Sequence, residues 1–191
     1  LDTLGWAITE PGIQKRFEEF LTLLRNDGVE IISRHDNPAV EAFEQALATI
    51  PEFQPDLAAW EMQWPALLVR DRGRDQIKER LVERFEFGER MSLDEYRVTL
   101  EALSKLRDVF ASLEGVADGF ITLPTPTMPP VGDATGDSVF GDPSSCLEAP
   151  AWCFPLLRES GLPLGIQLLG NKHQDYRLGQ IGQWMMETFL R

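Results

Sequence analysis

Several features that would assign a protein to a class are scarce in this sequence. Its 191 residues contain two cysteines and two histidines, too few for a disulfide framework. No apolar run approaches the roughly 18 residues that span a membrane. The first residues have neither the basic region nor the apolar core of a signal peptide. The sequence therefore predicts a reduced, cytoplasmic protein, processed or cut from a longer chain, with no membrane partner.

Motifs for phosphate, metal and serine-hydrolase sites are also missing. Neither Gly-x-x-x-x-Gly-Lys nor Gly-x-Gly-x-x-Gly occurs, so the usual phosphate cradles are absent. The chain has no Gly-x-Ser-x-Gly elbow and no Gly-Gly pair. His35 and His173 lack the spacing of a metal site. We predict no metal and no cofactor.

Positive charge is in short supply. The chain has 18 basic and 31 acidic residues, a formal net charge of −13. Binding to a phosphate backbone releases counterions only where a cationic face exists. The composition therefore argues against a nucleic-acid partner and against docking on anionic lipid.

Apolar periodicity predicts helices through the first part of the chain. One helix is expected over 11–27, with Thr9 as its N-cap and Gly28 just after its end, and Val29–Ile32 should then enter a sheet. A helix from about Pro38 follows. The next stripe should be split or kinked by Pro65 and capped by Asp56; its members are Leu57, Trp60, Trp64, Leu67 and Leu68.

Two more helices are expected before residue 114. Ile77, Leu81 and Phe85 form a third stripe, and Ser92 to Glu95 has the capping-box form that starts a long helix. We interpret these stripes as core packing rather than as a partner-binding groove.

The pattern changes after residue 114, where glycine and proline accumulate. Strands are predicted at 119–123, 151–154 and 164–169, the last two apolar on both faces and therefore buried. A long loop over 124–142 and a final amphipathic helix complete this part. We predict an α/β fold with a mixed, partly parallel sheet flanked by helices. It should comprise a helix–strand unit (1–35), a mostly helical insert (36–113), and strands, loops and the last helix (114–191).

No complete catalytic set can be assembled from the residue types. The four lysines lie in charged contexts typical of solvated surface. Ser144 and Ser145 are better interpreted as turn hydroxyls bonded to nearby backbone than as a nucleophile. Cys146 or Cys153 paired with His173 is a further possibility, but apolar surroundings disfavour a thiolate. We predict no catalytic residue in this chain.

Four segments resemble, in order, those of the amidase signature family. The first segment contains Arg80, Gly88, Ser92 and Tyr96 and resembles the approach to the family's long helix. A strand with a Thr-Pro loop comes next, then a Thr-Gly-Asp-x-x-Phe segment, and last a Gly-Leu-Pro-x-Gly-x-Gln-x-x-Gly strand. The three motif segments are Asp118–Pro126, Thr135–Phe140 and Gly161–Gly170. The chain departs from the family at Glu148-Ala149-Pro150, where a Gly-x-Pro is usual, and at Pro155.

The resemblance implies the C-terminal part of a Ser-Ser-Lys amidase, which hydrolyses carboxylic amides through an acyl-enzyme. The serines, the lysine and the oxyanion loop would lie in a missing N-terminal half, so this chain alone should be inactive. Its partners would be that half, or a second copy, and a small-molecule amide. Substrate contacts are expected in the loop between 124 and 146, at Thr125, Asp137, Phe140 and Cys146.

Three alternatives remain open. The chain could be a non-catalytic interaction module derived from an amidase, or part of an amidotransferase-type subunit that hands ammonia to an acceptor. It could also be an unrelated small hydrolase that uses Cys146 or Cys153. The doubly apolar strands predict, in each case, an exposed apolar surface or a partner that covers it.

Overall fold

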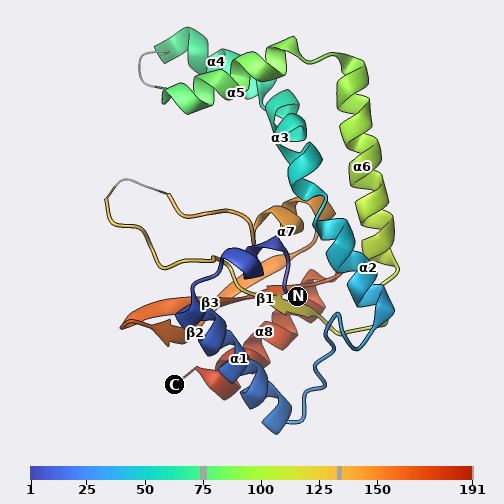
Figure 1. Cartoon of the computed structure of the whole chain (residues 1–191), viewed down its shortest axis with the longest axis vertical. Coiled ribbons are helices and arrows are strands. Elements are labelled where there is room, and N and C mark those ends of the chain that lie inside the picture. The colour runs from blue at the N-terminus through green and yellow to red at the C-terminus, as the bar shows by residue number, and fades with distance from the viewer. Residues whose placement is uncertain (74–76, 133–134, 191) are drawn as a thin grey trace. The chain divides into compact units, whose positions relative to one another are not determined.

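The structure, a computed structural model, divides the chain into two compact units (Figure 1). It describes residues 1–73, 77–132 and 135–190, without the side chains of 66, 67 and 70–72. The sheet unit comprises Leu1–Ala48 and Arg107–Arg191, and the helical unit comprises Thr49–Leu106. The chain is mostly helical and carries a small antiparallel sheet of three strands.

The sheet unit combines a short 3-10 helix with helices and strands that come from both ends of the sequence. In chain order its elements are η1 (Leu4–Ile8), α1 (Pro11–Asn26), α2 (Pro38–Leu47), the end of α6 (Leu93–Ala111), β1 (Phe120–Thr122), α7 (Asp142–Leu147), β2 (Ala151–Glu159), β3 (Leu162–Leu169) and α8 (Asp175–Phe189).

The sheet has the order β1-β3-β2, and both pairings are antiparallel. Phe120 lies opposite Leu169 in one pair, and Ala151 lies opposite Leu169 in the other. The prediction of a partly parallel sheet is therefore wrong for the described residues. β2 and β3 are joined by a tight turn at Ser160 and Gly161, and a tight turn can only return the chain antiparallel.

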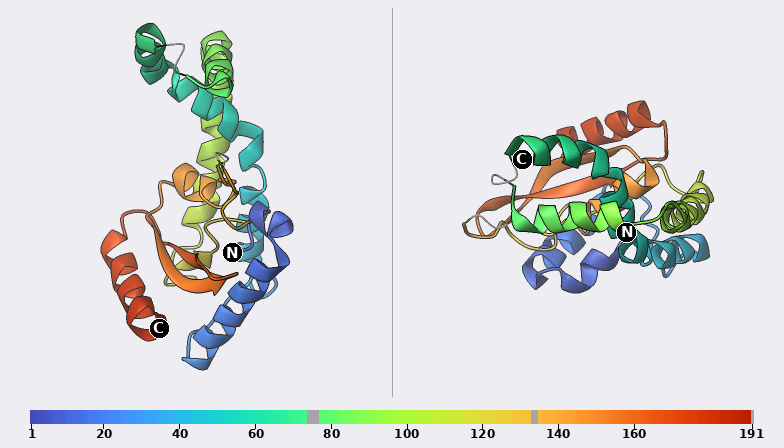
Figure 2. Two further views of the ribbon diagram at one scale, coloured as in Figure 1. Left: turned by 90° about the vertical axis from the view of Figure 1, so that its left-hand side faces the viewer. Right: turned by 90° about the horizontal axis from the view of Figure 1, so that it is seen from above.

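Alternation along the strands gives the sheet two distinct faces. One face carries Leu123, Phe154, Ile166 and Leu168, which form one core with side chains of α1 and α8. Figure 2 shows α1 (blue) and α8 (red) beside the strands. The ring centres of Phe20 in α1 and Phe189 in α8 are 5.4 Å apart. The opposite face carries Phe120, which packs against the rings of Phe43 and Phe110.

β2 is an edge strand, and much of it is exposed. Its burial was predicted from its apolar residues, but Trp152 is 46% exposed and Cys153 is also exposed. Pro155 does not end the strand: the pairing with β3 shifts register between Phe154 and Leu157 and then continues to Glu159. Proline is tolerated there because an edge strand needs no donor on its outer side.

The predicted strand at Val29–Ile32 is not formed among the described residues: the segment has no assigned secondary structure and belongs to no strand pair. α1 itself is confirmed over Pro11–Asn26, and Gly28 follows it with a φ of 88°, a conformation that favours glycine. The predicted N-cap is wrong, because Glu10 occupies that position. Thr9 instead donates its hydroxyl to the carbonyl of Gly5 at 2.7 Å.

The helical unit contains α3 (Ile50–Glu61), α4 (Gln63–Gly73), α5 (Glu79–Arg90) and most of α6. The predicted break falls at Met62 rather than at Pro65, which lies in the first turn of α4, where proline is tolerated. Asp56 lies inside α3 and caps nothing. The side chain of Leu67 lies outside the described residues.

The capping box at the start of α6 is confirmed. The Ser92 backbone N–H donates to the Glu95 carboxylate at 2.7 Å, and the Glu95 N–H donates to the Ser92 hydroxyl at 3.2 Å. Trp60 of α3 stacks on Tyr96 of α6, with ring centres 4.9 Å apart. The helices of this unit thus form from local signals and pack through aromatic contacts.

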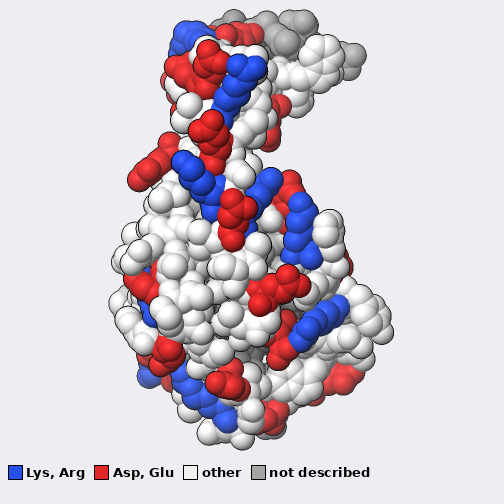
Figure 3. Space-filling model, turned by 90° about the vertical axis from the view of Figure 1, so that its right-hand side faces the viewer, with Lys and Arg blue, Asp and Glu red and all other residues white. Residues whose placement is uncertain are grey.

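Charges of both signs are mixed on the surface. On the face drawn in Figure 3, basic side chains are interspersed with acidic ones, and no continuous basic surface forms there. Of the described helices, none combines the length and apolarity needed to cross a bilayer.

Candidate functional site

The candidate site is the long loop between β1 and α7, together with α7 itself. The Thr125 hydroxyl donates to the Thr127 carbonyl at 3.0 Å. A side chain at Gly136 would lie 3.9 Å from that same hydroxyl, so the two limbs of the loop run close together. The structure therefore brings Thr125 near the Thr135–Phe140 segment. Asp133 and Ala134 lie outside the described residues.

Asp137 shapes the return limb of the loop. Its carboxylate accepts the backbone N–H of Val139 at 2.9 Å, the bond typical of an Asx turn. The Asp137 residue is exposed. A carboxylate in this position retains free lone pairs that face solvent, which suits it to contact a ligand as well as to hold the turn.

Phe140 anchors the end of the loop in the core. Its side chain is fully buried, and a Cβ on Gly5 would lie 2.4 Å from its ring, so only glycine allows η1 to approach this closely. The Gln167 side chain, from β3, donates to the Phe140 carbonyl at 2.7 Å. The Gln of the Gly-Leu-Pro-x-Gly-x-Gln segment thus fixes the Phe of the Thr-Gly-Asp segment.

α7 is held by charged side chains at its C-terminal end. The Arg107 guanidinium donates to the Cys146 carbonyl at 2.8 Å and pairs with Glu148 at 3.0 Å. Lys172 also pairs with Glu148. Lys172 and then Arg107 lower the pKa of the Glu148 carboxyl below its ordinary value. Cys146 itself is buried, so its side chain packs inside the sheet unit.

A row of polar side chains on the sheet was missed by the sequence interpretation. Thr122, Gln167 and Cys153 are successive cross-strand neighbours, so all three lie on the face that carries Phe120. Thr122 is 1% exposed, and its hydroxyl has no hydrogen-bond partner among the described residues. Each of the three strands contributes one of these residues to an otherwise apolar segment, and this was the signal that could have revealed the row.

Two of the nucleophiles considered from the sequence, Ser144 and Cys153, lie in environments that do not favour nucleophilic attack. Ser144 lies in α7 and donates its hydroxyl to the Gly141 carbonyl at 2.9 Å, as the turn interpretation predicted. Partial burial raises the pKa of the Cys153 thiol, which disfavours the nucleophilic thiolate. Within the described ranges, no group of three or more metal-ligating side chains gathers around a common point.

An apolar cavity of the sheet unit lies away from this loop. It has a volume of about 590 Å³ and is lined by α1, the segment after it, β1 and α8. Its lining includes none of Thr125, Asp137, Phe140 and Cys146. The predicted substrate contacts and this cavity therefore lie in different places.

Among the described residues, the loop supplies no acyl-transfer machinery. Its hydroxyl and carboxylate groups are bonded to their own backbone, and Gln167 and Arg107 hold its two ends. Amide hydrolysis requires a nucleophile, a base and donors for the oxyanion. The described residues bring no such set together at this loop.

Solved structures show which fold this chain has. A crystal structure of an amidase matches 95% of the chain with a TM-score of 0.77 and 17% identity. A glutamyl-tRNA(Gln) amidotransferase subunit from Thermotoga maritima matches 94%, with a TM-score of 0.59 and 20% identity. A bacterial aryl acylamidase of the amidase signature family matches 72%, with a TM-score of 0.50 and 14% identity.

The chain has the fold of part of an amidase signature enzyme. It spans 43%, 39% and 31% of those three structures, less than half the length of each. No protein-family model matches the sequence, and no curated protein matches it.

Proposed function

We propose that this chain is the C-terminal part of an amidase that hydrolyses carboxylic amide C–N bonds. The observation that carries the proposal is the match of 95% of the chain to a solved amidase at a TM-score of 0.77. The three motif segments support it, because Gln167 and Phe140 of two of them are joined by a hydrogen bond.

The reaction would proceed through a serine acyl-enzyme. A serine oxygen attacks the amide carbon, the C–N bond breaks, and the amine leaves with a proton from the general acid. Water then hydrolyses the ester and regenerates the serine. The serine, its base and the oxyanion donors would come from outside these 191 residues, because the described residues hold no such set.

This chain would contribute one wall of the substrate pocket. Asp137 and Thr125 would face the substrate from the loop. Phe140 and Cys146 would fix the position of the loop, because both side chains are buried.

Amide turnover by the isolated chain and by the complete polypeptide encoded by its gene tests the proposal. Both proteins are incubated with a panel of aliphatic and aryl amides, and released ammonia or amine is measured. The complete polypeptide should hydrolyse at least one amide and form a hydroxamate when hydroxylamine replaces water. Turnover by the 191 residues alone, or no acyl transfer by the complete polypeptide, would contradict the proposal.

A second candidate follows from the likeness to an amidotransferase subunit. In that case the released ammonia would pass to an acceptor, and the enzyme would need the acceptor for full turnover. Equal rates with and without partner proteins would favour a free-standing amidase. A chain without any acyl transfer, but with a stable protein partner, would favour the non-catalytic module. Loss of activity on alkylation of Cys146 and Cys153 would favour the thiol hydrolase.

A further inference from the structure

Glu148 has a backbone conformation that its residue type rarely adopts. It directly follows α7, with a φ of 52° and a ψ of 34°, in the left-handed region that favours glycine. The Ala149 N–H then donates to the Ser144 carbonyl at 3.1 Å, which closes the end of the helix. Glycine would form the same turn without strain, so the backbone alone does not explain a glutamate at this position.

The Glu148 side chain joins three segments of the sheet unit. Its carboxylate pairs with Arg107, near the end of α6, at 3.0 Å and with Lys172 in the loop after β3. The Arg107 guanidinium also donates to the Cys146 carbonyl at 2.8 Å, so it holds the last turn of α7 at two points. We call Arg107, Glu148 and Lys172 the α7 clamp.

Stability does not account for this clamp. The side chains of Arg107 and Glu148 are 35% and 46% exposed, and ion pairs this exposed contribute little to the free energy of unfolding, because water screens them. The left-handed backbone of Glu148 opposes even this small gain. The clamp therefore fixes a geometry more than it stabilises the fold.

The return limb of the candidate loop is continuous with α7. The Asx turn at Asp137 is followed by a second turn, in which the Ser138 carbonyl accepts two N–H groups. The donors are Gly141 at 2.7 Å and Asp142, the first residue of α7, at 3.1 Å. Because α7 has only six residues, a shift at its C-terminal end would move this turn and Asp137 with it.

We propose that Arg107 and Glu148 are positioning residues for the amide substrate. They act through α7: the clamp fixes the helix, and the helix fixes the limb over 135–140 that meets the substrate. Neither side chain is assigned a contact with the reacting amide, so neither is a catalytic residue. This inference rests on the proposed function, which places Thr125 and Asp137 against the substrate.

Loss of the clamp should weaken substrate binding rather than slow the chemistry. A group that contributes equally to binding the ground state and the transition state changes KM and leaves kcat unchanged. Kinetics of the complete polypeptide encoded by the gene, with the amide that it hydrolyses fastest, measure both constants. Arg107→Gln removes both contacts of the guanidinium with the end of α7. It should raise KM by about tenfold and change kcat by less than about twofold.

Glu148→Gly separates positioning from stability. Glycine adopts the left-handed backbone without strain, which offsets the loss of two ion pairs, so the melting temperature should stay close to that of the parent. KM should nevertheless rise by about threefold, because Arg107 keeps only its bond to the Cys146 carbonyl. The double variant should match Arg107→Gln within about twofold, since both substitutions break one clamp.

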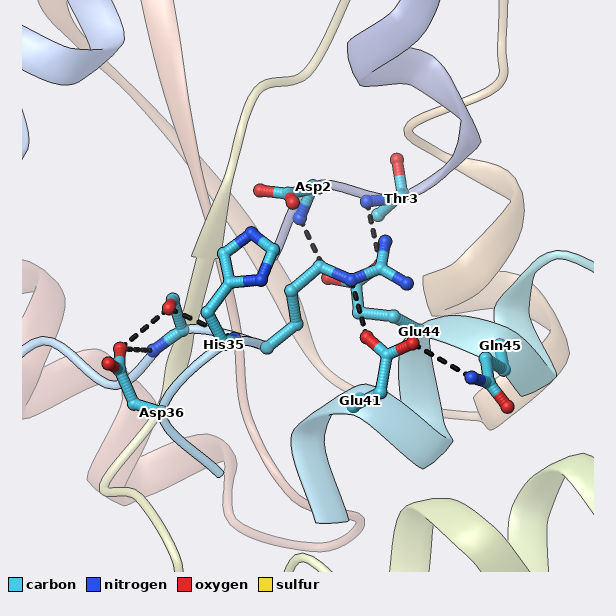
Figure 4. A network of polar contacts seen from close by, with 9 residues as sticks. Asp2, Thr3, His35, Asp36, Glu41, Glu44 and Gln45 are labelled. Carbon is cyan, nitrogen blue, oxygen red and sulfur yellow. Dashed lines mark hydrogen bonds and ion pairs between the residues drawn. The ribbon is translucent and has the colours of Figure 1, made fainter. Parts of the chain in front are cut away.

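Another arginine–glutamate pair of the sheet unit provides the matched control. Glu41, which lies beside Gln45 on α2 in Figure 4, pairs with Arg34 at 2.6 Å. The side chains of Arg34 and Glu41 are 29% and 36% exposed, similar to those of the clamp, and Glu41 lies within a regular helix. Arg34→Gln should change KM by less than about twofold.

Hydrogen exchange of the backbone over 135–147 gives a readout that does not require activity. Exchange should be faster in Arg107→Gln and Glu148→Gly than in the parent and in Arg34→Gln. Unchanged exchange, a lower kcat at unchanged KM, additive effects in the double variant, or an equal effect of Arg34→Gln would each overturn the proposal. If the complete polypeptide hydrolyses no amide, the proposed function fails, and the exchange rates alone decide whether the clamp holds the loop.

Discussion

The helical unit and the sheet unit are stabilised in different ways. In the helical unit the start of α6 is fixed by a capping box within four residues, and Trp60 stacks on Tyr96. In the sheet unit Arg16 pairs with Glu159, and the Leu1 nitrogen bonds to Ile121. The second kind of contact joins residues more than a hundred positions apart. The sheet unit therefore depends on contacts between distant segments, which local sequence patterns do not predict.

The largest expected effect is in the helical unit, at Gly88. A Cβ there would lie 2.2 Å from the backbone carbonyl oxygen of Ala59, and a backbone atom cannot move aside cheaply. Gly88→Ala should lower the free energy of unfolding of this unit by about 3 kcal/mol. Urea unfolding read by hydrogen exchange in α3 and α5 measures it. Glu83→Ala, at an exposed position of the same helix, should have little effect, and equal losses would argue that α3 and α5 are not packed this closely.

A somewhat smaller loss is expected in the sheet unit from Gln167→Met. The substitution keeps the length of the side chain but removes the donor to the Phe140 carbonyl, which then lacks its partner in a buried place. The free energy of unfolding should fall by about 2 kcal/mol. Gln183→Met on the exposed side of α8 is the control. Unchanged stability, together with unchanged amide exchange over 135–140, would remove Gln167 as the anchor of the loop.

Two glycines of α8 provide the next comparison. A Cβ on Gly182 would lie 2.2 Å from the ring of Phe154, whereas one on Gly179 would lie 3.8 Å from the nearest atom of Trp152. The ring lies on an edge strand and can shift, so Gly182→Ala should cost only about 1 kcal/mol. Gly179→Ala should be neutral or stabilising by several tenths of a kcal/mol, because alanine favours the helix. Identical melting temperatures for the two variants would contradict the packing of α8 on β2.

The smallest effect concerns the pH dependence of stability at Glu148. Lys172 and Arg107 lower the folded-state pKa of this carboxyl below its ordinary value of 4.5. The pairing therefore stabilises the fold above about pH 4.5, and this contribution is lost as the pH falls through the lowered folded pKa. Glu148→Gln should be slightly less stable than the parent at pH 7, and the difference should vanish in acid. A difference that persists after the pH has fallen through the folded-state pKa of the Glu148 carboxyl would contradict this origin.

Sequence patterns predicted the local features of the fold. The helix at 11–26, the long helix after Ser92 and the strands at Phe120 and Leu164 follow from periodicity and capping, which act over a few residues. The segment 29–32 shows the limit of such reasoning. Its four residues have the composition of a strand, but a strand exists only where another one pairs with it, and within the described residues none does.

The sequence motifs predicted which residues would gather in this loop region, but not the contacts that hold the loop in place. The motif segments placed Thr125, Asp137, Phe140 and Cys146 in one loop region, and the structure brings Thr125 beside the returning limb. The Phe140 ring packs in the core, and its carbonyl accepts a hydrogen bond from Gln167. This contact joins residues 27 positions apart. No periodicity reports such a contact, and the roles of the four residues toward a substrate stay predictions.

The register shift beside Pro155 makes the two edges of the sheet unequal as sites where another chain could add a strand. At the β2 edge, Pro155 has no backbone N–H to donate, and the strand is irregular between Phe154 and Leu157. Another chain could therefore not form a continuous row of hydrogen bonds there. The β1 strand contains no proline, and among the described residues no strand pairs with its outer edge. Assembly errors during synthesis should consequently begin at one side of the molecule only, and a chaperone or a fusion domain that shields this side should raise the yield of folded protein.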